Sequence, residues 1–280
     1  MYAVWVLLAC VHISRAAVPH FSSAQKVGTV GAHDIDEASG LAASRQHPGV
    51  LYTQNDKGDS SRIFAIAASS GKLLATIKIA HVANYDWEDL AVGPCPGSGS
   101  CIYIAETGDH AGDGAKNIIY RVKEPAVIKD QTLDVLDQLH FRWGEPDCEC
   151  VMVDPAGNTY VVSKVHGGRG LIAKLPSYGW GGTTVDAGPS QRVPITSTHN
   201  DPNGCDISPD GKEMLIKARD AVYYWSVPDG DYVSAVKTAP ATLPYHHEPR
   251  GESVAWTPTG DGYYTLSEGD DQPLYFYKRL

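Results

Sequence analysis

Residues 87–92 (WEDLAV), 101–106 (CIYIAE) and 117–122 (NIIYRV) decide the fold, because together they are one copy of a unit that recurs along the chain. Each copy opens with an acidic residue or a serine in front of a short apolar run. A β-rich stretch that ends in polar residues follows, and an apolar or aromatic stretch closes the unit. Short runs of β-branched and aromatic residues between Gly, Pro, Asp and Asn are typical of strands and turns. The unit therefore predicts several antiparallel strands.

The unit occurs five times, and its acidic residues at positions 37, 88, 149, 206 and 252 lie about 46 to 61 residues apart. A unit of this length has room for the four strands of a propeller blade. We therefore predict an all-β fold, a five-bladed β-propeller. Segments such as 72–79 and 126–143 are expected to form outer strands, and residues 18–30 to close the ring against the last blade. The alternative is a six-bladed propeller whose sixth blade lies within residues 125–142.

The first residues indicate export. Residues 2–11 are apolar, but this run is far shorter than the ~20 residues that a membrane helix needs. Residues 14–16 (SRA) place small side chains where a signal peptidase reads them. We predict a signal peptide over residues 1–16, a single propeller domain over residues 17–280, and a secreted, extracellular protein. No later stretch is long and apolar enough to span a membrane.

The charge of the chain bears on its partners. The sequence has 33 acidic against 23 basic residues, a formal net charge of −10. Nucleic-acid binding requires a basic patch, so this balance argues against nucleic acid as a partner. An acidic surface favours cations, although a solvated extracellular surface explains much of the charge by itself.

Cysteine usage also agrees with an oxidising compartment. Cys95 and Cys101 flank a PGSGS turn, which lets two strand ends meet in a local disulfide. Among Cys148, Cys150 and Cys205, one pair is expected to form and one thiol to remain. The C-x-C pair lies in a strand-like run, so both cysteines are expected to face the same side. A zinc site is disfavoured because no C-x-x-C element is present.

The repeat also predicts where the chemistry lies. In a propeller the first strand of each blade starts at the upper face, and the second strand ends there. The opening residues would therefore crowd around the axis, where ionised carboxylates need a cation among them. Calcium fits best, because it takes six to eight oxygen ligands. The alternative is that these acids only cap turns. The predicted ligands of the central metal are Ser39, Glu88, Glu149, Asp206 and Glu252.

Other polar residues are expected on the same face, either just before an opening residue or just after a second strand. A cation with His and Arg nearby could bind an anion or polarise a phosphate or ester. The plainer interpretation is that loop histidines are solvated surface residues. The candidate ligand contacts are Asp56, His81, Asp109, His199, Arg219 and Glu268.

Several motifs support a resemblance to known proteins: EASGLA at 37–42, QND at 54–56, DWEDLAVGP at 86–94, ISPDG at 207–211 and ESVAWTP at 252–258. With them the chain resembles a group of largely uncharacterised secreted propeller proteins of bacteria and invertebrates. It is more distantly similar to the calcium-activated nucleotidases (apyrases). That similarity implies five blades and an axial calcium supported by Ser39, Glu88, Glu149 and Glu252. The fourth blade departs, with Cys205 in register and Asp206 beside it. The nucleotidases' other nucleotide-contacting segments are not found.

Two functions follow as hypotheses, and the sequence does not decide whether the protein is an enzyme. The first is a secreted calcium-binding propeller that acts as an extracellular binding or matrix protein. The second is a calcium-dependent hydrolase of phosphoanhydrides or esters. A lectin-like role ranks lower, because the tryptophans do not repeat at equivalent positions in the units.

Overall fold

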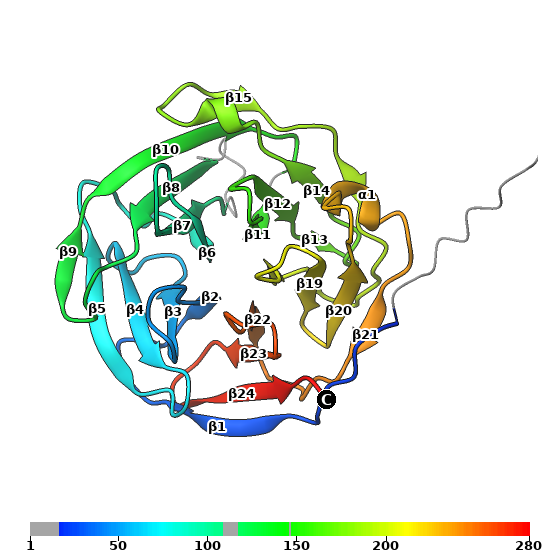
Figure 1. The fold of residues 1–280 in the computed structure, drawn as a ribbon, viewed down its shortest axis with the longest axis horizontal. Helices are drawn as coiled ribbons and strands as arrows, with labels where there is room; N and C mark the ends of the chain where they lie inside the picture. Colours follow the sequence, from blue (N-terminus) through cyan, green and yellow to red (C-terminus); the bar gives the residue numbers. More distant parts are fainter. Residues whose placement is uncertain (1–16, 109–116, 146) are drawn as a thin grey trace, which may run out of the picture.

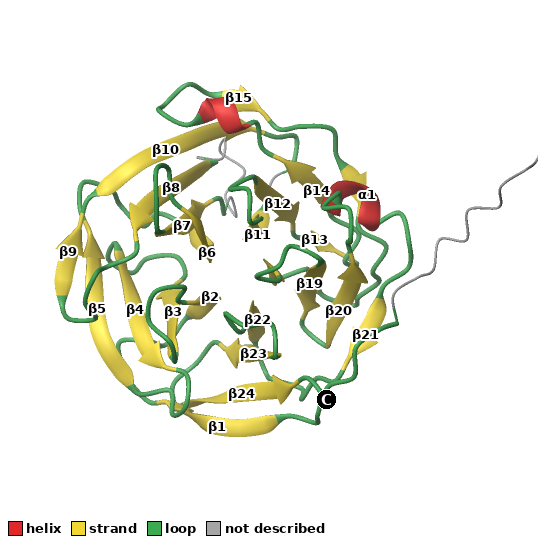
Figure 2. Ribbon diagram, in the orientation of Figure 1, coloured by secondary structure: helices red, strands yellow, loops and turns green. Residues whose placement is uncertain are grey.

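The computed structural model describes residues 17–108, 117–145 and 147–280, and it is a five-bladed β-propeller (Figure 1). The five-bladed prediction is confirmed. The blades stand around a central axis, which we call the channel, with their first strands innermost (Figure 1). Between the strands lie only loops and two short helical turns in the described ranges, η1 (Ser177–Gly179) and α1 (Tyr232–Ala235) (Figure 2). The predicted signal peptide, residues 1–16, lies outside the described residues.

Each blade is an antiparallel four-stranded sheet. Blade 1 contains β2 (Ala38–Ala43), β3 (Val50–Asn55), β4 (Arg62–Ala67) and β5 (Leu73–Ile79). Blade 2 contains β6 (Trp87–Pro94), β7 (Ser100–Glu106), β8 (Ile118–Lys123) and β10 (Val135–Arg142). Blade 3 contains β11 (Cys148–Val153), β12 (Thr159–Ser163), β14 (Leu171–Lys174) and β16 (Gln191–Arg192). Blade 4 contains β18 (Gly204–Ile207), β19 (Glu213–Ala218), β20 (Ala221–Ser226) and β21 (Ala241–Leu243). Blade 5 contains β22 (Gly251–Trp256), β23 (Gly262–Ser267), β24 (Gln272–Lys278) and β1 (Gln25–Val30).

The two ends of the propeller meet in blade 5. Strand β1 pairs antiparallel with β24, from Gln25 opposite Phe276 to Val30 opposite Gln272. The predicted closure by residues 18–30 is therefore confirmed. Because the outermost strand of blade 5 comes from the start of the ring and the chain runs on from it into blade 1, the β1–β24 ladder closes the ring.

Two further strands tie neighbouring blades at the rim. The connection from β8 to β10 forms β9 (Gln131–Leu133), which pairs parallel with β5 of blade 1. The connection from β14 to β16 forms β15 (Val185–Asp186), which pairs parallel with β10 of blade 2. The alternative of a sixth blade in residues 125–142 is wrong, because this segment supplies β9 to blade 1 and β10 to blade 2. Near the upper face, β13 (Val165–His166) pairs with β17 (Asn200–Asp201).

The core consists of five apolar clusters, each between two neighbouring blades. Successive residues of a strand face opposite sides of its sheet. In β6, Leu90 packs toward blade 1 while Ala91 packs toward blade 3. Both faces of each blade are therefore buried. This explains why the strands read as nearly continuous apolar runs rather than as alternating ones.

The innermost strands of four blades carry a β-bulge close to their start. In β6, β11 and β22 the residue left out of the pairing is Glu88, Glu149 or Glu252. A bulge changes which way the following side chains point. For this reason Cys148 faces blade 2 while Cys150 faces blade 4. The prediction that these two cysteines face the same side is wrong.

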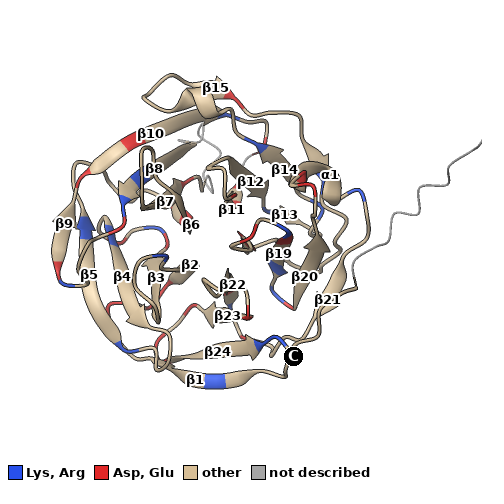
Figure 3. Cartoon of the chain, in the orientation of Figure 1, with Lys and Arg blue, Asp and Glu red and all other residues tan. Residues whose placement is uncertain are grey.

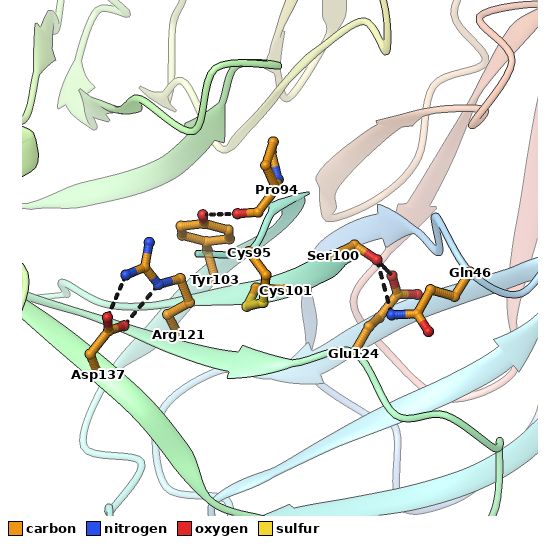
Figure 4. Close-up of a disulfide and its surroundings, with 9 residues drawn as sticks. All are labelled: Gln46, Pro94, Cys95, Ser100, Cys101, Tyr103, Arg121, Glu124 and Asp137. Carbon is orange, nitrogen blue, oxygen red and sulfur yellow. Dashed lines mark hydrogen bonds and ion pairs between the residues drawn. A yellow bond between two sulfur atoms is a disulfide. The ribbon is translucent and has the colours of Figure 1, made fainter. Parts of the chain in front are cut away.

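The described residues form two disulfides. Cys95 pairs with Cys101 across a turn of blade 2, as predicted (Figure 4). Cys150 pairs with Cys205 and joins the innermost strands of blades 3 and 4. The buried Cys148 is the free thiol of the described residues. Two disulfides are consistent with folding in an oxidising compartment. In the part of the chain that the structure covers, no helix has the length and apolarity of a bilayer crossing.

Candidate functional site

The pairing in blade 4 determines which residues are equivalent around the channel. Ser208 and Thr257 each donate a backbone N–H to the residue that starts their second strand, Glu213 or Gly262. Counting back five residues from these turns leads to Asn203 in blade 4 and to Glu252 in blade 5. Asn203, rather than Cys205 or Asp206, therefore occupies the position of the bulged glutamates.

This alignment defines three rings of residues at the upper mouth, the end of the channel where the innermost strands begin. The first ring holds the opening residues Ser39, Glu88, Glu149, Asn203 and Glu252. The second ring lies two residues earlier and holds Glu37, Asp86, Asp147, Asp201 and Arg250. The third ring follows each second strand and holds Asp56, Thr107, Lys164, Arg219 and Glu268.

Hydrogen bonds join the second and third rings in every blade. In four blades the backbone N–H of the third-ring residue donates to the carbonyl oxygen of the second-ring residue. In blade 4 the Arg219 N–H donates to the side chain of Asp201 instead, at 2.7 Å. The four backbone bonds are Asp56 to Glu37 (3.0 Å), Thr107 to Asp86 (3.3 Å), Lys164 to Asp147 (3.0 Å) and Glu268 to Arg250 (2.9 Å).

Five carboxylates from the three rings gather on one side of the upper mouth, and we call them the acidic cluster. Asp56, Asp86 and Glu88 offer oxygen atoms that all lie within 4.8 Å of one another. Glu88, Asp147 and Glu149 form a second group of this kind. Glu88 belongs to both groups, so it is the centre of the cluster, between blades 1 and 3.

Glu88 is the most constrained member of the acidic cluster. Its side chain is 1% exposed, and its Oε1 has no hydrogen-bond partner among the described residues. Burial raises the pKa of Glu88 well above its usual range, and the charges of Glu149, Asp56, Asp147 and Asp86 raise it further. A Cβ at Gly108 would lie 1.9 Å from Oε1 of Glu88, so only glycine allows the chain to pass this close.

An ammonium group adjoins the cluster. The Nζ of Lys164 lies 2.6 Å from Oε1 of Glu149. Burial raises the pKa of Glu149 to about 8, although the charge of Lys164 opposes the shift. Burial lowers the pKa of Lys164, but the charges of Glu149, Glu252 and Glu88 outweigh it and raise that pKa overall. Burial thus raises the pKa of Glu149 more than the pairing with Lys164 lowers it. A further cation would be needed to keep the cluster ionised.

Blade 5 contributes a separate set of contacts. Asn203 Nδ2 donates to Oε2 of Glu252, and burial raises the pKa of Glu252. The Nη1 of Arg250 lies 3.4 Å from Oε2 of Glu268. Burial raises the pKa of Glu268 to about 7, aided by the charges of Glu252 and Asp56. Glu252 is therefore held by an amide and does not belong to the acidic cluster.

The upper mouth is consequently asymmetric. Blades 1 and 2 contribute four of its acids, Glu37, Asp56, Asp86 and Glu88, and no basic residue from the three rings, although Lys57 beside the rings lies 3.3 Å from Asp86. The basic residues of the rings come from blades 3, 4 and 5 and are Lys164, Arg219 and Arg250. Acidic residues lie at the inner ends of several blades, while others are spread along the rim (Figure 3).

Two aspartates lie further inside the channel and cap backbone groups. Asp89 accepts the N–H groups of Leu90 (2.8 Å) and Val151 (2.9 Å). Asp206 accepts those of Ile207 and Trp256, both at 2.8 Å. Asp89 also lies near the sulfurs of Cys150 and Cys205, but these form a disulfide and are not free to ligate.

The structure thus corrects the expected position of Asp206. It lies three residues beyond the ring of opening residues, because Asn203 holds the ring position in blade 4. Burial raises the pKa of Asp206 to about 6, against the opposing charge of Arg45. Asp206 bridges the innermost strands of blades 4 and 5, where its two oxygens each bind a backbone N–H.

The other predicted contacts are spread over the upper face. Asp56, Arg219 and Glu268 lie in the third ring. His199 lies outside the rings and pairs with Asp220 at 3.3 Å, as does His247. His81 follows β5 in the outer part of blade 1 and is exposed. Asp109 lies outside the described residues. Ser39 Oγ donates to the backbone oxygen of Glu88, so it supports the cluster indirectly.

Asp86, Asp147 and Asn203 at the upper mouth were not anticipated from the sequence. A signal for the first two exists. Asp86 precedes Glu88 by two residues, and Asp147 precedes Glu149 by two residues, so a D-x-E pattern repeats in successive blades. Because both residues of the pattern begin an innermost strand, the repeat indicates two pairs of carboxylates at one mouth.

Comparisons with known proteins add to the fold. No family model and no curated protein matches the sequence. The structure is similar to that of the PQQ-bound aldose sugar dehydrogenase from Streptomyces coelicolor, with a TM-score of 0.51 over 93% of this chain and 99% of that chain. The two sequences are 13% identical. That protein is also a propeller, so the similarity supports the architecture.

Proposed function

We propose that the protein is a secreted calcium-binding propeller, whose cation at the acidic cluster holds an anionic group of an extracellular ligand or matrix. The observation that carries the proposal is the position of Glu88. Its buried Oε1, without a hydrogen-bond partner in the described ranges, lies among carboxylates from three blades. Buried carboxylates of this kind either stay protonated or bind a cation.

The donor set suits calcium. All five members of the cluster offer carboxylate oxygens, the hard donors that calcium prefers over nitrogen or sulfur. Asp86, Glu88 and Glu149 are buried, while Asp56 and Asp147 are half-buried, which leaves one side open to solvent. When bound, calcium would supply positive charge to the five acids and free coordination positions to a ligand. We expect a dissociation constant of about 0.1–1 mM, the range of extracellular modules.

The basic residues on the other side of the upper mouth indicate the class of ligand. Lys164 is paired with Glu149, whereas the Nε of Arg219 is buried without a hydrogen-bond partner among the described residues. A guanidinium and a calcium ion on one mouth can both contact the oxygens of a phosphate, sulfate or carboxylate group. The expected ligand is therefore anionic, despite the acidic charge of the chain.

Calorimetry on chelator-treated protein tests the metal. We expect Glu88→Gln to weaken calcium binding by about a hundredfold or more, because it removes the shared oxygen donor while keeping the shape. Glu252→Gln is the matched control, since it changes a glutamate of the same ring that lies outside the cluster. A change of less than about threefold is expected there.

Two outcomes would contradict the proposed site. An equal loss of calcium affinity in Glu88→Gln and Glu252→Gln would indicate that the cation lies on the axis, between all five blades. The absence of calcium binding at about 10 mM would remove the cation altogether, and Glu88 would then be a neutral buried carboxyl. The melting temperature of each variant, measured without calcium, shows whether it is folded.

A calcium-dependent hydrolase of phosphoanhydrides or esters is the second candidate. It is favoured by the presence of a carboxylate cluster, two arginines and Glu268 around one mouth, a combination that can bind and polarise a phosphoryl or acyl group. Glu268 would hold the proton-accepting position, and Arg219 would orient the substrate. Phosphate release from a nucleoside diphosphate, or aryl-ester cleavage, should then require calcium and be abolished in Glu88→Ala. Calcium-loaded protein that cleaves neither substrate would leave binding as the function.

A further inference from the structure

The opposite end of the channel has a cavity of its own. We call this end the lower mouth, where the turns between the first and second strands of the blades converge. A cavity of about 450 Å³ opens there, a volume within the range of small-molecule sites. All five blades contribute to its lining, which includes Arg45, Val92, Pro94, Val153, Pro155 and Pro258.

The blade alignment shows that this lining is regular except at one position. Pro94, Pro155, Pro209 and Pro258 are equivalent residues of blades 2 to 5, each six residues after its opening residue. In blade 1 the equivalent residue is Arg45. Four proline rings thus form an apolar collar, and a single guanidinium replaces the fifth ring.

The backbone of Arg45 is held in place by a buried carboxylate. Glu124 accepts hydrogen bonds from the hydroxyls of Ser44 and Ser100, and from that of Tyr52 at 3.1 Å. It also accepts the backbone N–H of Arg45 at 3.3 Å. Gln46 completes the network by donating to Ser100 (Figure 4). The turn that carries Arg45 is therefore anchored on both sides, which positions its side chain at the cavity.

The guanidinium itself is available. Arg45 is half-buried, and its side chain makes no hydrogen bond or ion pair with a described residue. The charge of Arg45 acts on Asp206, whose two oxygens already accept backbone N–H groups. The guanidinium can thus present its fork of N–H donors to a carboxylate.

The other polar groups of the lining are already engaged. Asp154 accepts hydrogen bonds from Ala156, Asn158 and Tyr160. Ser208 donates to Asp210, and Ser100 donates to Glu124. The cavity therefore presents apolar walls, the hydrogen-bonded carboxylate of Asp154, and one cationic group with free donors, Arg45. A pocket of this composition suits a ligand with an apolar body and one anionic end.

We propose that the lower mouth binds a small organic carboxylate, whose apolar body lies on the proline collar and whose carboxylate pairs with Arg45. The site is independent of calcium and of the acidic cluster, which lies at the opposite end of the channel.

Fluorine NMR with para-fluorobenzoate tests the proposal on the folded protein. We expect saturable line broadening with this probe. We expect binding at least about tenfold weaker for the uncharged para-fluorobenzamide, because it lacks the charge-assisted pair with the guanidinium. Arg45→Gln should cause the same loss for the carboxylate and leave the weak binding of the amide unchanged.

Two controls locate the binding. Glu88→Gln should leave para-fluorobenzoate binding unchanged, since it alters only the upper mouth. An unchanged melting temperature would show that Arg45→Gln is folded, as expected for a side chain without a described partner. Equal binding of the acid and the amide, or acid binding that survives Arg45→Gln, would overturn the proposal. So would the lack of saturable binding at about 10 mM probe.

Discussion

The two mouths of the channel are built from the same repeat, yet they differ in how the repeat is used. At the lower mouth four of five equivalent positions are proline, and one is Arg45. At the upper mouth no ring has the same residue in more than three blades, and the basic residues are confined to blades 3 to 5. At the upper end the backbone also varies, because the innermost strand of blade 4 lacks the bulge of the other four. The repeat therefore conserves one residue type in four blades at the lower mouth, whereas it varies in polar and charged residues at the upper mouth.

The largest expected effect comes from removing the disulfides. Cys150–Cys205 joins two blades in the upper half, while Cys95–Cys101 closes a turn near the lower mouth. Replacing both cysteines of a pair by Ala should lower the free energy of unfolding by about 4 kcal/mol for Cys150 and Cys205, which are 55 residues apart. The expected loss is about 2 kcal/mol for Cys95 and Cys101, which are 6 residues apart. Chemical unfolding of both double variants measures the difference.

The second test uses pH. Glu88, Glu149 and Glu268 have raised pKa values in the folded protein, so the stability that they contribute is present at low pH and is lost as pH rises. In chelator, the free energy of unfolding should fall by on the order of 3 kcal/mol between about pH 5 and pH 9. Saturating calcium should flatten this decline, because it stabilises the ionised carboxylates. A decline that calcium does not change would show that the acids of the upper mouth do not bind it.

The smallest expected effect comes from Asn203, the amide within the ring of opening residues. Asn203→Asp replaces the donor to Glu252 by a carboxylate, so it should destabilise the calcium-free protein by about 1 kcal/mol. Calcium affinity should stay the same if the cation lies at the acidic cluster between blades 1 and 3. A clear gain in affinity would instead place the cation on the axis, within reach of blade 4.

Much of the fold could be predicted because the repeat carries it. The spacing of the opening residues indicated five blades, and the strand-like residues 18–30 indicated the closure. The sixth-blade alternative arose because residues 125–142 exceed the length of one outer strand, and pairing with a neighbouring blade through β9 leaves no local pattern. The orientation of Cys148 and Cys150 was missed because a bulge depends on the partner strand.

The site could be predicted only in part. Glu88 and Glu149 were placed at the mouth because they open their units, but the fourth unit was aligned on its apolar run, which favoured Asp206. Alignment on the turns Asp154-Pro155, Ser208-Pro209 and Thr257-Pro258 would have identified Asn203 and also Arg45. The gathering of Asp56 and Asp147 around Glu88 could not be predicted, since it depends on contacts between three blades.

The rim strands β9 and β15 join the blades whose inner ends carry the acidic cluster. They join blade 1 to blade 2 and blade 2 to blade 3, the three blades that supply the cluster. These three blades are thus joined by strand pairing at the rim, while their innermost strands pack together at the centre. We therefore expect the carboxylates to keep similar separations with and without an ion, and such preorganisation reduces the conformational entropy lost when an ion binds.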